Sequence, residues 1–111
     1  MANNREADAK RIASLIGLAK KAGKVTSGIP IICDALRAGK KPILILVSES
    51  ASDNSIKKIS DKSVYYNVEL LKIPLSSEEL AHSVGKSGST AAVAINDNGL
   101  AGLVRSALIQ D

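Results

Sequence analysis

Apolar residues near the start of the chain recur at helical spacing. Between residues 5 and 22 they return every three or four positions, which predicts an amphipathic helix with one side turned toward a core. The predicted inward positions are Ile12, Leu15, Ile16 and Ala19. Gly23 follows the last turn, where a residue in the left-handed conformation commonly ends a helix. We therefore expect a surface helix that packs one face on the rest of the domain.

Short apolar runs separated by turn residues follow this helix. A strand is predicted at 25–27, and a second helix is expected to end at Gly39. Pro30 stands in the first turn of that helix, where its missing N–H costs no hydrogen bond. The run PILILV at 42–47 is apolar at every position, which is typical of a strand covered on both faces. Helices are therefore expected on both sides of the sheet.

The second half of the chain continues the alternation. A polar, serine-rich loop opens a helix that we expect to run to about Lys62. Strands at 69–74 and 90–95 flank a short helix at 76–85 that has a serine cap. The last helix carries on one face Leu100, Leu103, Val104 and Leu108. Alternating strands and helices predict an α/β fold in layers, with a largely parallel or mixed sheet.

Composition limits the class of protein. The 111 residues fit one domain, so we expect a single domain over 1–111. No apolar run approaches the ~20 residues that a bilayer requires, and the N-terminus has no apolar core of a signal peptide. We expect a cytoplasmic monomer with no membrane partner. The lone cysteine, Cys33, lies in an apolar run and is interpreted as a buried thiol, which excludes a disulfide framework.

Catalytic and metal-binding patterns are missing from the sequence. His82 is the only histidine, and no carboxylate pair has metal-ligand spacing. No nucleophile, base and acid are ordered into a triad. The sequence favours a binding module over an enzyme, and it indicates no cofactor and no metal.

The stretch AHSVGKSGST at 81–90 contains the Gly-Lys-Ser of phosphate-binding loops. Such a loop needs a glycine five residues before Gly85, where this chain has Leu80, and it must lead from a strand into a helix. Here the order is reversed. AGK at 22–24, AGKK at 38–41 and VGK at 84–86 instead follow predicted helices, where glycine caps the helix and lysine complements its negative end. The segment SGST remains as a flexible polar loop.

Basic residues exceed acidic ones by 15 to 11, giving a net charge of +4 and a mild bias toward polyanions. They cluster at loops and helix ends, and together with the N-terminus of the second helix they could hold a phosphate backbone. The residues concerned are Lys20, Lys21, Lys24, Arg37, Lys40, Lys41, Lys57, Lys58, Lys62 and Lys86. Tyr65 and Tyr66 are the only aromatic residues, and we interpret both as packing at a helix end.

The order of motifs resembles a known family. LIGLAKKAGKVTSG, ALRAGKKPILILVSESASDNSIKKISDK, EELAHSVGK and AAVAIND together resemble the bacterial YlxQ-like branch of the kink-turn RNA-binding ribosomal protein family, over roughly residues 11 to 108. The resemblance implies a three-layer α/β/α sandwich with a four-stranded mixed sheet and no enzymatic activity. It also implies binding of structured RNA, with ribosomal RNA and the ribosome or other proteins as candidate partners.

By position, the resemblance also implies an RNA-binding face. It comprises the first strand with the start of the second helix, the loop after the second strand, and the loop after the fourth helix. The residues carried over are Lys24, Thr26, Ser27, Gly28, Ile29, Pro30, Ser48, Glu49, Ser50, Lys86, Ser87 and Gly88.

This chain departs from the family at the residues that read the kink-turn. The family has Gly, any residue, Asn, Glu, two residues and Lys, whereas here Gly28 is followed by Pro30, Ile31 and Asp34 at the three polar positions. Losing three such groups is expected to abolish that mode of recognition. We predict RNA binding that is weaker or differently specified, through backbone amides near Gly28 and through lysines.

Two other functions compete with RNA binding. Ile29, Pro30 and Ile31, if exposed, would form an apolar patch, as expected of a protein-interaction adaptor that kept the fold and lost RNA recognition. A nucleotide-binding enzyme is disfavoured by the failed phosphate loop and by the missing catalytic residues.

Overall fold

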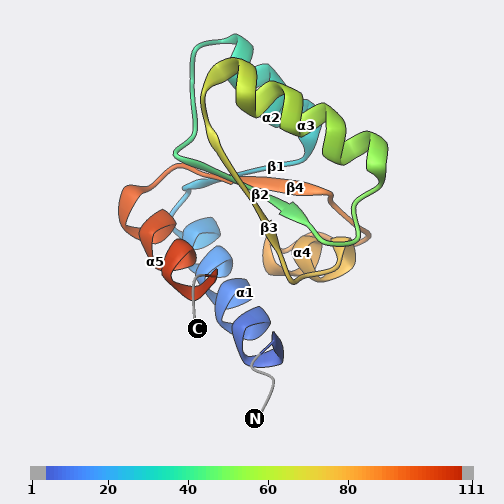
Figure 1. Ribbon diagram of the computed structural model, residues 1–111. Helices are drawn as coiled ribbons and strands as arrows, with labels where there is room; N and C mark the ends of the chain where they lie inside the picture. The colour runs from blue at the N-terminus through green and yellow to red at the C-terminus, as the bar shows by residue number, and fades with distance from the viewer. Residues whose placement is uncertain (1–4, 109–111) are drawn as a thin grey trace.

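The computed structural model describes residues 5–108, which form five helices and a four-stranded mixed sheet (Figure 1). The helices are α1 (Arg5–Lys21), α2 (Ile29–Arg37), α3 (Asp53–Tyr66), α4 (Ser77–Ser83) and α5 (Asn98–Leu108). The strands are β1 (Val25–Ser27), β2 (Leu44–Ser48), β3 (Glu69–Ile73) and β4 (Ala92–Ile95). Helices and strands alternate along the chain, so the predicted α/β class is confirmed.

The strands are ordered β1-β4-β2-β3, and β4 runs against the other three. β2 and β3 are parallel with Leu44 opposite Glu69, while Ala94 of β4 lies between Thr26 of β1 and Ile45 of β2. All five residues of β2 are buried, as predicted from the apolar run at 42–47. Central β2 and β4 thus carry the core on both faces of the sheet.

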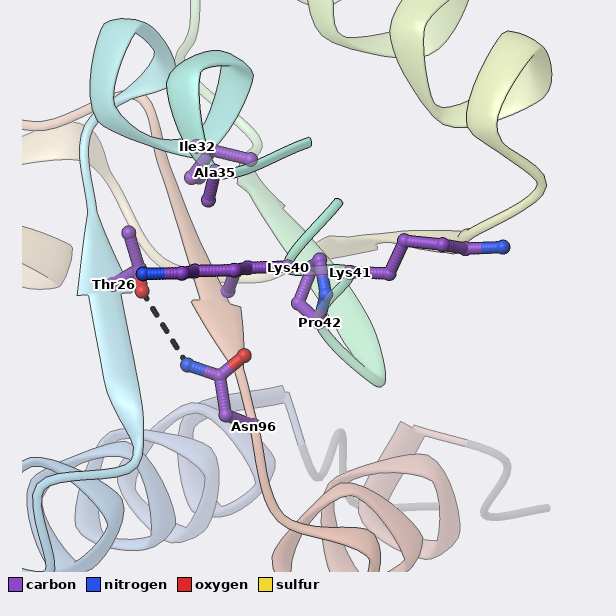
Figure 2. A pocket seen from close by; sticks show the side chains of 8 residues that line it. Thr26, Ile32, Ala35, Lys40, Lys41, Pro42 and Asn96 are labelled. Atoms are coloured by element: carbon purple, nitrogen blue, oxygen red, sulfur yellow. Dashed lines mark hydrogen bonds between the residues drawn. The ribbon is translucent and has the colours of Figure 1, made fainter. Parts of the chain in front are cut away.

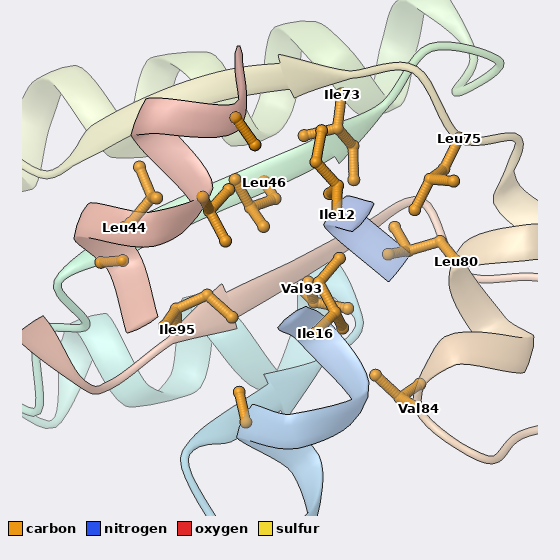
Figure 3. Close-up of a cluster of buried hydrophobic side chains, with 14 residues drawn as sticks. Ile12, Ile16, Leu44, Leu46, Ile73, Leu75, Leu80, Val84, Val93 and Ile95 are labelled. Atoms are coloured by element: carbon orange, nitrogen blue, oxygen red, sulfur yellow. The ribbon is translucent and has the colours of Figure 1, made fainter. Parts of the chain in front are cut away.

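Helices cover both faces and make three layers. α1, α4 and α5 pack on one face and α2 and α3 on the other (Figure 1). Figure 3 shows the larger cluster, where Ile12 and Ile16 of α1 meet Leu46 and Val93 of the sheet. The three-layer sandwich with a four-stranded mixed sheet is therefore confirmed.

The inward face of α5 differs from the prediction. Leu103 is 54% exposed, and the buried positions of this helix are Ala101, Val104 and Ala107. Leu103 therefore faces solvent, whereas Leu100 and Leu108 pack against the cluster as predicted. The periodicity correctly predicted a helix, but it wrongly placed Leu103 on the buried face.

Three helices end in the same hydrogen-bonded motif, as predicted from the repeated Gly-Lys. A glycine takes a positive φ, and the N–H of the following lysine donates to the carbonyl five residues earlier. The φ values are 72°, 78° and 73° at Gly23, Gly39 and Gly85. The donor–acceptor distances are 2.8 Å from Lys24, 2.9 Å from Lys40 and 2.9 Å from Lys86.

α3 is one turn longer than expected. It continues past Lys62 to Tyr66, and Asn67 ends it in the left-handed conformation at φ 58°. The Ser63 hydroxyl donates to the carbonyl of Ser60 at 2.8 Å, so this buried serine has an acceptor inside the helix. Tyr66 packs against the core beneath α2 and α3, as predicted, whereas Tyr65 is 79% exposed, contrary to the prediction.

Within residues 5–108, no helix combines the length and apolarity needed to span a bilayer. The same part of the chain holds no group of three or more His, Cys, Asp or Glu residues arranged to bind a metal ion. Cys33 is a free thiol, 3% exposed, and its predicted burial is confirmed.

Candidate functional site

Strand direction decides which loops meet at one edge of the sheet. β1, β2 and β3 end where β4 begins, so the three loops that follow these strands and the loop that precedes β4 lie together. We call this edge the rim and define it as residues 27–31, 48–52, 74–77 and 86–91. In α/β sheets, ligands commonly bind where parallel strands end. The rim is therefore the first place to look for a binding site.

Gly28 joins the rim to the sheet. Its N–H donates to the carbonyl of Ala92 at 2.9 Å, and its own carbonyl accepts the N–H of Ile32 at 3.0 Å, which begins α2. Its φ of 95° and ψ of 136° belong to a conformation that residues with a side chain rarely adopt. Glycine is therefore needed for the chain to turn from β1 directly into α2.

The first turn of α2 presents open backbone N–H groups. No side chain caps this helix and no acidic residue lies in its first turn, whereas Ser52 and Ser76 cap α3 and α4. Within residues 5–108, the N–H groups of residues 29 and 31 have no hydrogen-bond acceptor. Uncapped N–H groups at the positive end of a helix attract anions.

Three serine hydroxyls hold two loops of the rim together. The oxygens of Ser48, Ser50 and Ser77 lie 3.2 to 3.3 Å from one another. Buried Ser48 also donates to the carbonyl of Leu75 at 2.8 Å, and Ser50 accepts the N–H of Ser77 at 2.9 Å. The loop after β2 is thus fixed to the loop after β3. The sequence analysis missed Ser77, which becomes apparent only once β2 and β3 are known to be parallel neighbours.

The loop before β4 completes the rim. Thr90 donates its N–H to the carbonyl of Ser77 at 3.0 Å, which anchors one end of the loop. Lys86, Ser87 and Gly88 are exposed between that anchor and the end of α4. The loop therefore offers an ammonium group and a hydroxyl to solvent from a fixed base.

Two of the predicted residues face inward instead of outward. Ile29 is only 7% exposed, because it packs into the core under α2, so the apolar patch expected at 29–31 is reduced to Pro30 and Ile31. Ser48 is completely buried, and its hydroxyl holds the loop rather than facing solvent. Glu49 and Ser50 are exposed, and Ser27 is half-buried at the end of β1.

Lys24 lies away from the rim, and Thr26 lies in β1 one residue before it. At about 3.3 Å per residue along a strand, Lys24 is roughly 13 Å from Gly28, at the opposite end of β1. Thr26 accepts a hydrogen bond from the Asn96 side chain at 3.3 Å (Figure 2). It lines a pocket of about 240 Å³ together with Ile32, Ala35, Lys40, Lys41, Pro42, Ala94 and Asn96. This pocket is separate from the rim.

Five lysines lie toward the edge of the sheet opposite the rim. There, the end of β4 binds both neighbouring segments: the Asn96 N–H donates to the carbonyl of Lys24 at 2.8 Å, and the Ile43 N–H donates to that of Ile95 at 2.9 Å. We call the lysines at this edge the basic edge: Lys20, Lys21, Lys24, Lys40 and Lys41. Contrary to expectation, the structure does not bring these five lysines to the start of α2. Lys86 alone carries positive charge within the rim as defined.

The sandwich agrees with what similarity to known proteins shows. The chain belongs to the ribosomal protein L7Ae/L30e/S12e/Gadd45 family, whose model matches residues 10–104. It is 38% identical over 94 residues to the RNA-binding protein YlxQ of Bacillus subtilis (strain 168), covering 85% of this chain and 91% of that protein. It is 34% identical over 96 residues to the RNA-binding protein YlxQ of Enterococcus faecium, covering 86% and 89%. None of these names is that of an enzyme, and the resemblance seen in the motifs is confirmed.

Solved structures share the fold. A Bacillus halodurans protein of unknown function superposes with a TM-score of 0.79 at 22% identity, covering 90% of this chain and 98% of that one. The Giardia lamblia 15.5kD RNA binding protein superposes with a TM-score of 0.70 at 17% identity, covering 97% of this chain and 88% of that one. At these identities, the likeness shows a common architecture only.

Proposed function

We propose that this protein is a non-enzymatic, ribosomal-protein-like RNA-binding protein that holds structured RNA against the rim. The observation that carries the proposal is the uncapped first turn of α2, placed by Gly28 beside three loops that hydrogen bonds fix together. Membership of the family and the two relatives named for RNA binding support it. We propose structured RNA because hydrogen bonds tie the rim loops into one surface.

Phosphate oxygens are the groups that the rim fits best. The N–H groups of residues 29 and 31 donate to one phosphate at the positive end of α2, and the Lys86 ammonium contacts a neighbouring one. Ser87 contributes a hydroxyl that donates to phosphate or ribose oxygens, while the Ser50 hydroxyl donates to Ser77 and holds the loops together. Contacts of this kind position an RNA without reading its bases.

Base-specific recognition of a kink-turn is not part of the proposal. Pro30 has no donor, Ile31 projects an apolar side chain into solvent at 55% exposure, and Asp34 is engaged in an ion pair with Arg37. None of the three supplies a hydrogen bond of the kind that reads a sheared G·A pair. We expect similar affinities for a kink-turn and for an unrelated folded RNA.

The test is a gel-shift titration at several salt concentrations with a kink-turn RNA and an unrelated hairpin. Affinity should fall steeply with salt, and Lys86→Ala should reduce the slope of log K against log[salt] by about 1. Arg105→Gln is the matched control, because it removes the same charge from α5, where Arg105 contacts Glu69 at 2.7 Å. A flat salt response, or strong selectivity for the kink-turn, would refute the proposed contacts.

An adaptor function has one observation in its favour. Pro30 and Ile31 are both exposed next to the open end of α2, and an exposed apolar pair at a rigid edge can bind a protein. Capture of partners by the tagged protein, with and without nuclease, separates the two functions. A partner that survives RNA digestion and is lost in Ile31→Ser would favour the adaptor over RNA binding.

A further inference from the structure

The last turn of α3 exposes an aromatic ring that the rim does not use. Tyr65 is 79% exposed and its neighbour Val64 is 81% exposed. At about 1.5 Å per residue, the 14 residues of α3 span roughly 20 Å, and the helix begins at the rim, so Tyr65 lies that far from it. An exposed aromatic side chain is notable in a chain that has only two aromatic residues.

The Tyr65 ring packs against the ring of its neighbour Tyr66. It meets the ring of Tyr66 edge to face, with centroids 4.8 Å apart and planes at 81°. Tyr66 is half-buried and packs against the core under α2 and α3, so it is itself held in place. One aromatic ring therefore supports another and leaves it open to solvent. A ring held in this way loses little conformational freedom when a flat ligand stacks on it.

Unpaired positive charge lies on the same side of α3 as this ring. Lys62 and Lys58 precede Tyr65 by three and seven residues, which places all three on one side of α3. Neither lysine forms an ion pair within residues 5–108, although Lys57 is paired with Asp61 at 3.4 Å. The nearby acidic groups are thus neutralised while the lysines beside the ring are not.

The basic edge continues this charge. β2 and β3 are parallel with Leu44 opposite Glu69, so the segments just before them, which contain Lys41 and Tyr66, end at the same side of the sheet. Figure 2 shows the Lys41 side chain extending away from the pocket while that of Lys40 runs toward β1. Glu69, the acidic residue at the start of β3, is paired with Arg105 at 2.7 Å.

We propose that Tyr65 and the lysines around it form a second RNA contact, which takes an unpaired nucleotide. The base stacks on the open face of Tyr65, and the flanking phosphates contact Lys62 and Lys41. An aromatic face within a cluster of lysines is the usual composition of sites for single-stranded RNA. This inference rests on RNA being the ligand of the rim, and it adds that a single-stranded tail of that RNA reaches the far end of α3.

Tyrosine fluorescence tests the stacking directly, because the chain has two tyrosines and no tryptophan. In Tyr66→Phe, Tyr65 is the only emitter, and a single-stranded oligouridine should quench its emission with saturation. In Tyr65→Phe, where Tyr66 alone emits, the same titration should leave the emission nearly unchanged. Absence of quenching in Tyr66→Phe, or equal quenching in both variants, would overturn the proposal.

Affinity measurements separate this contact from the rim. A hairpin with a single-stranded tail should bind more tightly than the same hairpin without one, and Tyr65→Ala should weaken binding of the tailed RNA about fivefold or more. The same substitution should leave the affinity for the blunt hairpin unchanged. Val64→Ala is the matched control, since it truncates an equally exposed neighbour and should leave both affinities unchanged.

The two proposals fail in different ways. If Lys86→Ala leaves the affinity for the blunt hairpin and its salt dependence unchanged, the rim proposal fails, whatever the tail does. If the tailed and blunt hairpins bind equally and Tyr65→Ala changes neither, the Tyr65 contact fails while the rim contact stands. A third outcome would also overturn the proposal. If Tyr65→Ala loses a protein partner that remains bound after nuclease treatment, and its RNA affinities are unchanged, this surface binds a protein rather than RNA.

Discussion

Substituting Gly28 tests whether the backbone turn that starts α2 is strained for any other residue. An added Cβ at Gly28 would meet no atom within 4 Å, so a Gly28→Ala protein suffers no steric clash. Its φ of 95° is the sole obstacle. Gly102 in α5 is the matched control, because its Cβ would also find open space while its backbone is ordinary helix.

The two substitutions share one effect and differ in another. Both remove a glycine from the unfolded chain, which favours the folded state by about 0.4–1 kcal/mol. Gly102→Ala has no opposing cost and should raise the free energy of unfolding by up to about 1 kcal/mol. Gly28→Ala must in addition hold alanine in a disfavoured conformation, which costs about 1–3 kcal/mol. The two variants should therefore differ by about 1–3 kcal/mol.

Urea unfolding followed by circular dichroism measures this difference, provided that the m-values of the two variants agree. We expect Gly102→Ala to have a higher midpoint than the parent protein and Gly28→Ala a lower one. A Gly28→Ala protein as stable as Gly102→Ala would refute the reasoning, since it would show that the turn into α2 requires no glycine. Gly28→Ala should also weaken hairpin binding, because the added methyl would stand where the proposed RNA contact approaches the backbone.

Three further substitutions test features of the fold. Ile12→Ala should lower the free energy of unfolding by about 2–5 kcal/mol in a urea titration, because Ile12 is completely buried in the larger cluster. Ser76→Ala should lower it by about 1 kcal/mol by removing the capping box of α4, and Ser76→Asp should restore most of the loss. Ser48→Ala should cost about 1 kcal/mol and raise hydrogen exchange at the N–H of Ser50, which the Ser48 hydroxyl accepts at 3.1 Å; exposed Ser87→Ala should change neither quantity.

Local sequence signals predicted most helix ends correctly. The prediction was wrong at the end of α3, where weak helix propensity conflicted with packing against the core. Glycine after each of three helices placed their ends correctly, because only a left-handed residue lets the following lysine N–H reach back into the helix. The end of α3 was predicted too early, since the Ser-Val-Tyr run after Lys62 has weak helix propensity. Packing of Ile59, Ser63 and Tyr66 against the core keeps that turn helical.

The location of charge could not be predicted from the pattern, because it depends on strand direction. A lysine that closes a helix before a strand lies at the edge where that strand begins. Lys24 and Lys40 precede β1 and β2, which run the same way, while Lys86 precedes β4, which runs against them. Three similar motifs therefore place lysines at two opposite edges, a split that the sequence alone does not reveal.

The exposed positions of the rim bear on how such a protein evolves, because the rim residues that belong to the hydrophobic clusters, Ile29 and Leu75, are buried. Serine hydroxyls and backbone hydrogen bonds tie the rim loops together, and exposed positions such as Pro30 and Ile31 contribute little to the core. Mutations at those positions can accumulate without a penalty in folding. The sandwich can thus survive changes at its exposed rim positions, so the ligand of the rim can change while the scaffold stays the same.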